Sequence, residues 1–284
     1  MTSPPHRVRR PAATTLTYRA RTDGSPADHT TLKVYPPAGD APTADCLWVV
    51  FIHGGAWRDQ AQTKDLGDSI VDSLPAHWGG ASINYRLSPA VQHPDHVHDV
   101  LDALSLLSES QGFTAKTRVV LSGHSAGACL AFQAFYGLYM QQISALASGP
   151  AGAADLGMVF NSIVGVVGSE GIYDLVALAD EYPAYVSFIE PAFGDRDHWA
   201  APSPQHFEWE KLVTDYTKFM VVQSREDDLL SPAQSTAFVR RLTDAGWPVQ
   251  FHLVSAGSHM DAIDHPTYLT LLRDFCTSVE RAHV

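Results

Sequence analysis

The sequence has little positive charge, few cysteines and no long run of hydrophobic residues. Its 19 Lys and Arg residues are outnumbered by 31 Asp and Glu residues, so the formal net charge is −12. An acidic protein repels phosphate backbones and anionic membrane surfaces, so we expect no nucleic-acid partner and no membrane association. No apolar stretch reaches the roughly 20 residues of a membrane-spanning helix. The amino terminus also lacks the apolar stretch of a secretory signal.

Cysteine is scarce as well. The three cysteines, Cys46, Cys129 and Cys276, are odd in number and far apart in the sequence. This spacing is not that of a disulfide framework, and without a C-x-x-C pair a zinc ribbon is excluded. Free thiols persist in a reducing compartment, so we expect a cytoplasmic protein.

The composition is that of one sizeable domain. The chain has 284 residues, of which 45 % are hydrophobic and 18 % are charged, so it can bury a core and is not expected to be disordered. A basic cluster at residues 6–10 lies in an amino-terminal stretch rich in Pro and Thr. We predict a flexible amino-terminal tail over residues 1–30 and one domain over residues 31–284.

Strand-like and helix-like patterns alternate along this domain. Leu47–Ile52 is apolar at every position, which is typical of a strand buried on both faces of a parallel sheet. The spacing predicts further strands over residues 31–35 (at the sheet edge), 81–85, 118–121, 163–167, 218–222 and 249–254, and helices over residues 97–107, 126–140, 232–245 and 266–279. Repeated alternation predicts an α/β fold, with a mostly parallel sheet and helices on both faces.

The segment over residues 174–206 interrupts this alternation. It is rich in Pro, Tyr, Phe and Trp, and it contains the sequence Tyr182-Pro183-Ala184-Tyr185. Aromatic residues on such a segment can line a binding site or simply cover a sheet edge. Both interpretations stay open, and we expect a small cap-like insertion in the α/β domain.

A serine lies in the tight turn that follows one of the expected strands. Residues 118–121 run into Gly123-His124-Ser125-Ala126-Gly127, and an apolar helix follows. A serine hydroxyl is a weak nucleophile that needs exposure and a neighbouring base, and a strand–turn–helix context with flanking glycines supplies the exposure. Ser125 is therefore the candidate nucleophile of an α/β-hydrolase that transfers an acyl group to water.

A second glycine turn lies upstream, directly after Leu47–Ile52. It reads His53-Gly54-Gly55-Ala56-Trp57. In this fold the oxyanion hole is built from N–H groups of such a loop and of the residue after the nucleophile. We therefore assign the backbones of Gly54, Gly55 and Ala126 to the oxyanion hole, although an ordinary Gly-Gly turn would have the same sequence.

An acid and a histidine follow the last two expected strands, in the order that this fold uses. Glu226-Asp227-Asp228 comes after residues 218–222, and His259 comes after residues 249–254. His259 would accept the proton of Ser125 and later return it to the leaving group. Asp227 would orient the imidazole and stabilise its charged form.

Other residues could fill these roles. Asp228 is the rival acid. His252 and His265 are rival bases, but one lies inside an expected strand and the other precedes a proline that starts a helix. The cluster His93–Asp99 contains three histidines without the H-E-x-x-H spacing of a metal site, so we expect no metal.

The sequence resembles the kynurenine formamidase (arylformamidase) branch of the α/β-hydrolases and is most similar to its fungal-type members. The segments that carry the resemblance are His53–Trp57, Gly123–Gly127, Glu170–Asp174, Glu181–Tyr185 and Glu226–Leu230. The likeness extends from about Leu32 to Phe275 and favours Asp227 as the acid. The third glycine of an H-G-G-G esterase motif is Ala56 here, which leaves the oxyanion hole intact if Gly54 and Gly55 supply its N–H groups.

The resemblance implies hydrolysis of N-formyl-L-kynurenine to L-kynurenine and formate in tryptophan breakdown toward NAD, without metal or organic cofactor. The leaving aryl amine needs an aromatic-lined space, and we expect Trp57 to bind it. The alternative is a small-ester carboxylesterase of the hormone-sensitive-lipase group, which would use the same triad. An intact Ser, Asp and His set argues against a non-catalytic binding protein. We expect a monomer or a homodimer.

Overall fold

The computed structural model describes residues 10–19, 29–39, 45–148, 154–212 and 216–281. Eight strands in this part of the chain form one sheet, in the order β1-β2-β4-β3-β5-β6-β7-β8. β1 and β2 run antiparallel to their neighbours, and all other pairs are parallel. The strands are β1 (Thr14–Thr17), β2 (Thr31–Tyr35), β3 (Leu47–Ile52), β4 (Gly79–Ile83), β5 (Arg118–His124), β6 (Ile163–Ser169), β7 (Lys218–Ser224) and β8 (Val249–Val254).

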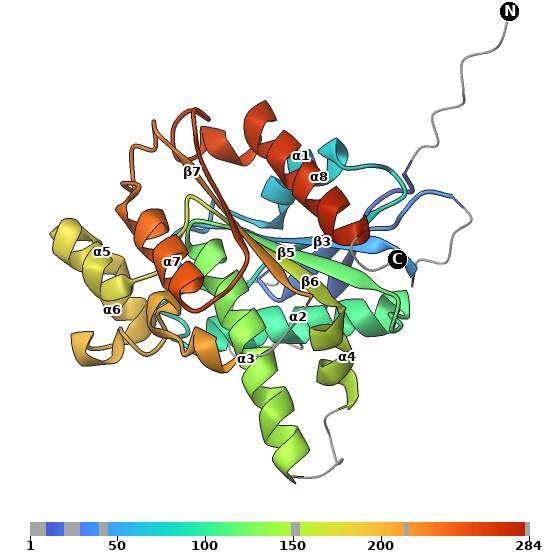
Figure 1. Cartoon of the computed structure of the whole chain (residues 1–284), viewed down its shortest axis with the longest axis horizontal. Helices are drawn as coiled ribbons and strands as arrows, with labels where there is room; N and C mark the ends of the chain where they lie inside the picture. The colour runs from blue at the N-terminus through green and yellow to red at the C-terminus, as the bar shows by residue number, and fades with distance from the viewer. Residues whose placement is uncertain (1–9, 20–28, 40–44, 149–153, 213–215, 282–284) are drawn as a thin grey trace, which may run out of the picture.

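Helices cover both faces of the sheet, which confirms the predicted α/β fold (Figure 1). One face packs against α1 (Gly67–Ser73) and α8 (Pro266–Arg281). The other face packs against α2 (Asp95–Gln111), α3 (Ala126–Ser148), α4 (Ala154–Ser162) and α7 (Ala233–Asp244). None of the helices within the described residues combines the length and the apolarity needed to cross a bilayer.

The apolar run of β3 is explained by burial on both faces. Trp48, Val50 and Ile52 belong to the core beneath α2 and α3, whereas Leu47, Val49 and Phe51 belong to the core beneath α1 and α8. Full burial of such a side chain contributes about 1.5–3 kcal/mol. These contacts place β3 in the middle of the sheet. β3, β5, β6, β7 and β8 are parallel, so the loops that follow them meet at one edge of the sheet.

The predicted flexible tail over residues 1–30 is wrong for its middle part. Thr14–Thr17 forms β1, which pairs antiparallel with β2. β1 supplies the edge of the sheet, so Thr31–Tyr35 is an interior strand and not the predicted edge strand. The pairing gives partners to backbone groups of β2 that would otherwise face solvent. Residues 1–9 and 20–28 of the predicted tail lie outside the described residues.

The other predicted elements are present, some with different bounds. β4 covers Gly79–Ile83 instead of residues 81–85, and α3 continues beyond the predicted residue 140 to Ser148. The helix α4 is absent from the sequence-based prediction. It directly precedes β6, so its apolar residues belong to the same hydrophobic stretch as that strand.

Residues 174–206 form a helical segment between β6 and β7, which we call the cap. It contains α5 (Leu175–Glu181) and α6 (Val186–Phe193), together with three short 3₁₀ helices. Asp174 caps α5, because its carboxylate accepts the N–H groups of Val176 (3.0 Å) and Ala177 (3.1 Å). Figure 1 shows α5 and α6 together on one side of the molecule, the same side as α7.

Candidate active site

Ser125 forms the turn between β5 and α3. β5 ends at His124 and α3 begins at Ala126, and the φ of Ser125 is +56°. A residue with a Cβ is strained at this φ, and a strained turn between a strand and a helix is where this fold exposes its nucleophile. The Ser125 N–H donates to the carbonyl of Ser169 at the end of β6 (2.9 Å), which fixes the turn.

The glycines on either side of Ser125 allow backbones to approach closely. A Cβ at Gly123 would lie 2.1 Å from the Gly127 carbonyl oxygen, and a Cβ at Gly127 would lie 2.1 Å from the Ile52 carbonyl oxygen. Both distances are far below van der Waals contact, so neither position accommodates a side chain. The motif therefore packs the start of α3 against the end of β3, where the second glycine turn begins.

The turn after β3 lies directly beside Ser125. A Cβ at Gly54 would come within 2.9 Å of the Ser125 Cβ. The next three residues, Gly55, Ala56 and Trp57, all have positive φ values (+97°, +49° and +57°). This left-handed run turns the chain sharply at the edge of the sheet, where a reacting carbonyl would lie.

The Tyr85 hydroxyl, which the sequence does not single out, orients this turn. It lies within hydrogen-bond distance of the carbonyl oxygens of His53 (3.1 Å) and Gly54 (2.9 Å). A planar trans peptide points its N–H away from its carbonyl, so the N–H groups of Gly54 and Gly55 face away from the tyrosine. Within the described residues, these two N–H groups and that of Ala126 have no protein acceptor. They are free to bind an oxyanion.

Trp57, the residue predicted to bind substrate, is completely buried. Its side chain has no exposed surface. It packs edge-on against Phe193, with 4.8 Å between ring centroids, and at a tilt against Phe188, at 6.3 Å. A large aromatic ring gains most from such apolar burial. Trp57 therefore joins the turn after β3, the candidate oxyanion turn, to α6 of the cap and lines no open space.

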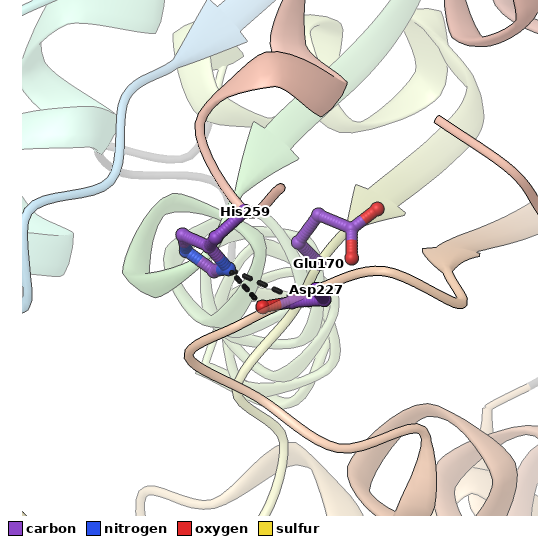
Figure 2. Close-up of side chains that lie close together, drawn as sticks. All are labelled: Glu170, Asp227 and His259. Carbon is purple, nitrogen blue, oxygen red and sulfur yellow. Dashed lines mark hydrogen bonds and ion pairs between the residues drawn. The ribbon is translucent and has the colours of Figure 1, made fainter. Parts of the chain in front are cut away.

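Asp227 and His259 are hydrogen-bonded to each other (Figure 2). His259 Nδ1 lies 2.9 Å from Asp227 Oδ2 and 3.1 Å from Oδ1, and both side chains are almost completely buried. Burial alone would raise the pKa of Asp227, but hydrogen bonds from His259 and Glu170 outweigh it and hold the pKa well below its ordinary value. Asp227 is therefore ionised, so Nδ1 carries the ring proton and Nε2 is the basic nitrogen.

The rival residues have other contacts. The Asp228 carboxylate accepts a hydrogen bond from the backbone N–H of His259 (3.0 Å). It therefore positions the backbone of the loop after β8, which carries His259, and not the imidazole ring. His252 lies within β8. His265 accepts the N–H of Thr267 through Nδ1 (3.2 Å) at the start of α8.

His124, the second residue of the serine motif, links the turn at Ser125 to the loop that carries His259. Its Nε2 donates to the backbone carbonyl of His259 (2.9 Å). Burial lowers the pKa of His124 to about 3, so the ring is neutral. The backbone of His259 is thus fixed by a residue adjacent to Ser125, a contact that the motif alone does not reveal.

Glu170 is a further buried residue, and no sequence motif assigns it a catalytic role. An oxygen of Glu170, an oxygen of Asp227 and a ring nitrogen of His259 lie within 4.8 Å of one another. Three such side chains could in principle ligate a metal, but Asp227 and His259 already bind each other. The one signal in the sequence is that Glu170 belongs to a segment that carries the family resemblance.

The histidine cluster His93–Asp99 does not converge on a common point. His96 Nε2 lies 3.0 Å from the Ser88 hydroxyl. Asp99 instead pairs with the Arg86 guanidinium at 2.8 Å. These side chains therefore act in separate structural contacts at the start of α2.

The fold and the arrangement of these residues define the class: the protein is an α/β-hydrolase. A truncated form of a carbohydrate esterase from gut microbiota matches its fold with a TM-score of 0.71 at 16 % identity, covering 99 % of this chain and 100 % of that chain. Esterase B from Lactobacillus Rhamnosis matches with a TM-score of 0.70 at 18 % identity, covering 95 % and 87 %. Both likenesses are likenesses of fold.

Sequence comparison narrows this class to a family. The BD-FAE family model matches residues 32–242. The kynurenine formamidase of Meyerozyma guilliermondii is 35 % identical over 230 residues, which cover 80 % of this chain and 83 % of that protein. The kynurenine formamidase of Eremothecium gossypii is 32 % identical over 238 residues, covering 82 % and 92 %. The chain belongs to the kynurenine formamidase family, and it is a hydrolase.

Proposed function

We propose that the protein hydrolyses N-formyl-L-kynurenine to L-kynurenine and formate in tryptophan breakdown, with Ser125, His259 and Asp227 as its catalytic triad. The observation that carries the proposal is the 2.9 Å bond between His259 Nδ1 and Asp227, in a kynurenine formamidase family member whose serine has a positive φ. These three residues follow β5, β8 and β7, whose ends share one edge of the sheet.

The first half of the reaction forms a formyl-enzyme. The Ser125 Oγ attacks the formyl carbon while His259 Nε2 accepts the hydroxyl proton. The N–H groups of Gly54, Gly55 and Ala126 stabilise the oxyanion, which carries more charge than the substrate carbonyl. The intermediate then collapses: the C–N bond breaks, and the protonated His259 gives its proton to the departing aryl amine.

The second half releases formate. Water takes the place of the amine, its oxygen adds to the formyl carbon, and His259 accepts one of its protons. Collapse breaks the bond to Ser125 Oγ, which takes the proton back from His259. Asp227 stays ionised and stabilises the imidazolium in both halves. Side chains of this chain carry every proton transfer, so the proposed mechanism includes no metal and no organic cofactor.

The close approach of Gly54 to Ser125 supports a small acyl group. A single added Cβ at Gly54 would lie 2.9 Å from the Ser125 Cβ, so the turn after β3 packs directly against Ser125, and we expect room for only a small acyl group on this side. Formyl is the smallest acyl group. We propose that the aryl amine leaves on the cap side, where Tyr182 and Tyr185 stack at 4.9 Å and the Tyr185 hydroxyl donates to the Leu229 carbonyl (2.8 Å) on the acid loop.

The test compares wild type with Ser125→Ala on N-formyl-L-kynurenine, with formate measured as product. We expect wild-type turnover and a loss of about 10³-fold or more in kcat/KM for the variant. Wild-type protein that releases no formate above the uncatalysed rate would refute the substrate. The same triad would also cleave small aryl esters, so the ratio of kcat/KM for the formamide and for p-nitrophenyl acetate decides between formamidase and carboxylesterase.

We also propose a cytoplasmic enzyme. Cys46, Cys129 and Cys276 are free thiols, and free thiols are typical of a reducing compartment. The prediction of a monomer or homodimer is checked by size-exclusion chromatography with light scattering, which measures the molar mass of the protein in solution.

A further inference from the structure

Glu170 lies directly after β6, with its side chain beside the Asp227–His259 pair (Figure 2). The residue is fully buried. Its φ is +49°, a conformation that residues with a Cβ rarely adopt. Such strain persists only where the surrounding structure determines it, and it clusters at functional sites. The chain therefore turns sharply at this point and directs a carboxyl group toward the candidate acid.

The Glu170 carboxyl has few partners, and it shares one of them with Asp227. The Ser224 N–H donates to its two oxygens at 2.8 and 3.0 Å. The Gln223 amide nitrogen donates to Glu170 Oε2 (2.5 Å) and to Asp227 Oδ2 (2.9 Å), so one side-chain amide bridges both carboxyls. The side-chain amide oxygen of Gln223, Oε1, accepts a hydrogen bond from the Ser235 hydroxyl at 2.8 Å. This bond fixes the orientation of the bridging amide.

Asp227 is the better site for a negative charge. Besides the bridging amide it accepts His259 Nδ1–H and the N–H groups of Leu229 and Leu230, both at 2.9 Å. No Lys or Arg in the described part of the chain forms an ion pair with Glu170. Two adjacent buried carboxylates repel each other, so one of them retains its proton. Burial and the neighbouring Asp227 raise the pKa of Glu170 to about 9.

We propose that Glu170 is a positioning residue, protonated in the active enzyme, whose carboxylic acid donates a hydrogen bond to the Asp227 carboxylate. The inference rests on the proposed triad and assigns the pair a single negative charge. A second negative charge beside His259 would favour the imidazolium, which cannot accept the proton of Ser125. The neutral acid thus orients Asp227 and keeps His259 available as a base.

Four other titratable groups surround Glu170, and the two tyrosines among them leave this balance unchanged near neutral pH. Asp227 faces it from the loop after β7, and His259 faces it from the loop after β8. Tyr173, on its own loop, and Tyr268, from α8, also interact with it electrostatically. Burial raises the pKa of both tyrosines far above neutral, so neither is charged.

The test uses Glu170→Gln and Glu170→Met in the 284-residue chain. Glutamine keeps the shape and still donates to Asp227 through its amide, whereas methionine fills the space without a donor. We expect Glu170→Met to lower kcat about 10- to 100-fold with little change in KM, and glutamine to rescue most of this loss. The wild-type rate should fall above about pH 9, because Glu170 then loses the proton that it donates to Asp227, and this fall should be missing in Glu170→Gln.

Two further readouts are independent of the natural substrate. The rate at which a fluorophosphonate labels Ser125, measured against pH, reports on the triad in every variant. An infrared band of a protonated carboxyl should be present in wild type at pH 7 and missing in Glu170→Gln. Glu109 lies exposed near the end of α2, away from the strand ends that carry the triad. Glu109→Gln removes a remote negative charge, so it controls for the charge change that would occur if Glu170 were ionised.

An ionised Glu170 would give a different result. Its replacement by glutamine would remove a negative charge beside His259 and so make the imidazolium less favourable. The fall in labelling rate at acid pH would then occur about one pH unit lower than in wild type. That shift, or wild-type kinetics in Glu170→Met, would overturn the proposal. If Glu170→Met fails to fold, the infrared band and the glutamine profile still decide. Failure of the proposed substrate would appear separately, as absence of formate with labelling intact.

Discussion

The two sides of the candidate site are stabilised by different kinds of interaction. On the acid–histidine side, buried polar groups from the loops after β7 and β8 bond directly to each other, with Asp227 and His259 at 2.9 Å. On the oxyanion side, the turn after β3 is oriented by one tyrosine hydroxyl and connected to the cap by Trp57, which packs against Phe193. One side depends on protons and charges, and the other depends mainly on shape.

This difference predicts different responses to mutation. A hydrogen bond between buried charged groups has a strict direction, and removing one partner leaves the other uncompensated. Aromatic packing has a broader optimum and loses stability in proportion to the volume removed. Changes on the acid–histidine side should therefore act on kcat and on the pH profile, and changes near the cap should act on stability first.

The largest effect is expected for the acid that contacts the histidine ring. Asp227→Asn should lower kcat by about 10³- to 10⁴-fold, because the amide no longer selects the tautomer with Nδ1–H or stabilises the imidazolium. Asp228→Asn is the matched control, since its side-chain oxygen can still accept the His259 N–H. We expect a loss of less than about threefold for that variant. Equal losses in the two variants, measured as steady-state formate release, would contradict the assignment.

The next effect tests the oxyanion side. Tyr85→Phe removes the hydroxyl that binds the carbonyls of His53 and Gly54 and should lower kcat about 10- to 100-fold, with a smaller change in KM. Tyr139→Phe is the control, because it deletes another tyrosine hydroxyl. Tyr139 lies far along α3, away from the candidate site, and its hydroxyl donates to the Lys211 carbonyl at 2.9 Å. A Tyr85→Phe enzyme with the kcat of this control would show that the turn keeps its orientation without the hydroxyl.

The features that the sequence predicts well are encoded locally. The apolar run of β3, the two glycine turns and the acid and histidine after successive strands can each be found within a few residues. Trp57 marks the limit of such local patterns, because its aromatic character is visible in the sequence but its complete burial against α6 is not.

The contacts that the sequence does not predict depend on the order of strands in the sheet. Tyr85 reaches the oxyanion turn because β4 pairs with β3, although α1 separates the two strands in the chain. Glu170 meets Asp227 because β6 lies beside β7. Thr14–Thr17 forms an edge strand, although this short, mostly polar stretch does not predict one. Neighbours of this kind are set by how the whole core packs.

A smaller effect is expected where the oxyanion turn meets the cap. Trp57→Phe should lower the free energy of unfolding by about 1–3 kcal/mol, because the smaller ring fills less of the space beside Phe188 and Phe193. We expect a change of only a few-fold in kcat, since the backbone of the turn is still bound by Tyr85. Urea unfolding measures the first effect and steady-state formate release measures the second, and amide hydrogen exchange of α6 locates the loss of stability. A variant with wild-type stability and a large loss of kcat would mean that Trp57 acts on the chemistry.

An effect of similar size, visible as a change with pH, concerns a titrating group on the oxyanion side, where shape should dominate. Burial lowers the pKa of His53 from 6.5 to about 4, so the unfolded chain binds a proton here below pH 6.5 that the folded protein does not accept until about pH 4. The stability that neutral His53 provides is therefore complete above pH 6.5 and is lost as the pH falls from 6.5 to 4. His53→Gln removes this proton uptake but also the stacking of the ring on Tyr85 at 4.5 Å, so it should be less stable than wild type at pH 8. The difference in unfolding free energy between wild type and His53→Gln should narrow by on the order of 1–3 kcal/mol between pH 8 and pH 5. It narrows because only the wild type loses the stability that neutral His53 provides. A gap that stays constant over this range, measured by urea unfolding, would show that His53 is protonated in the folded protein and that charge matters on this side as well.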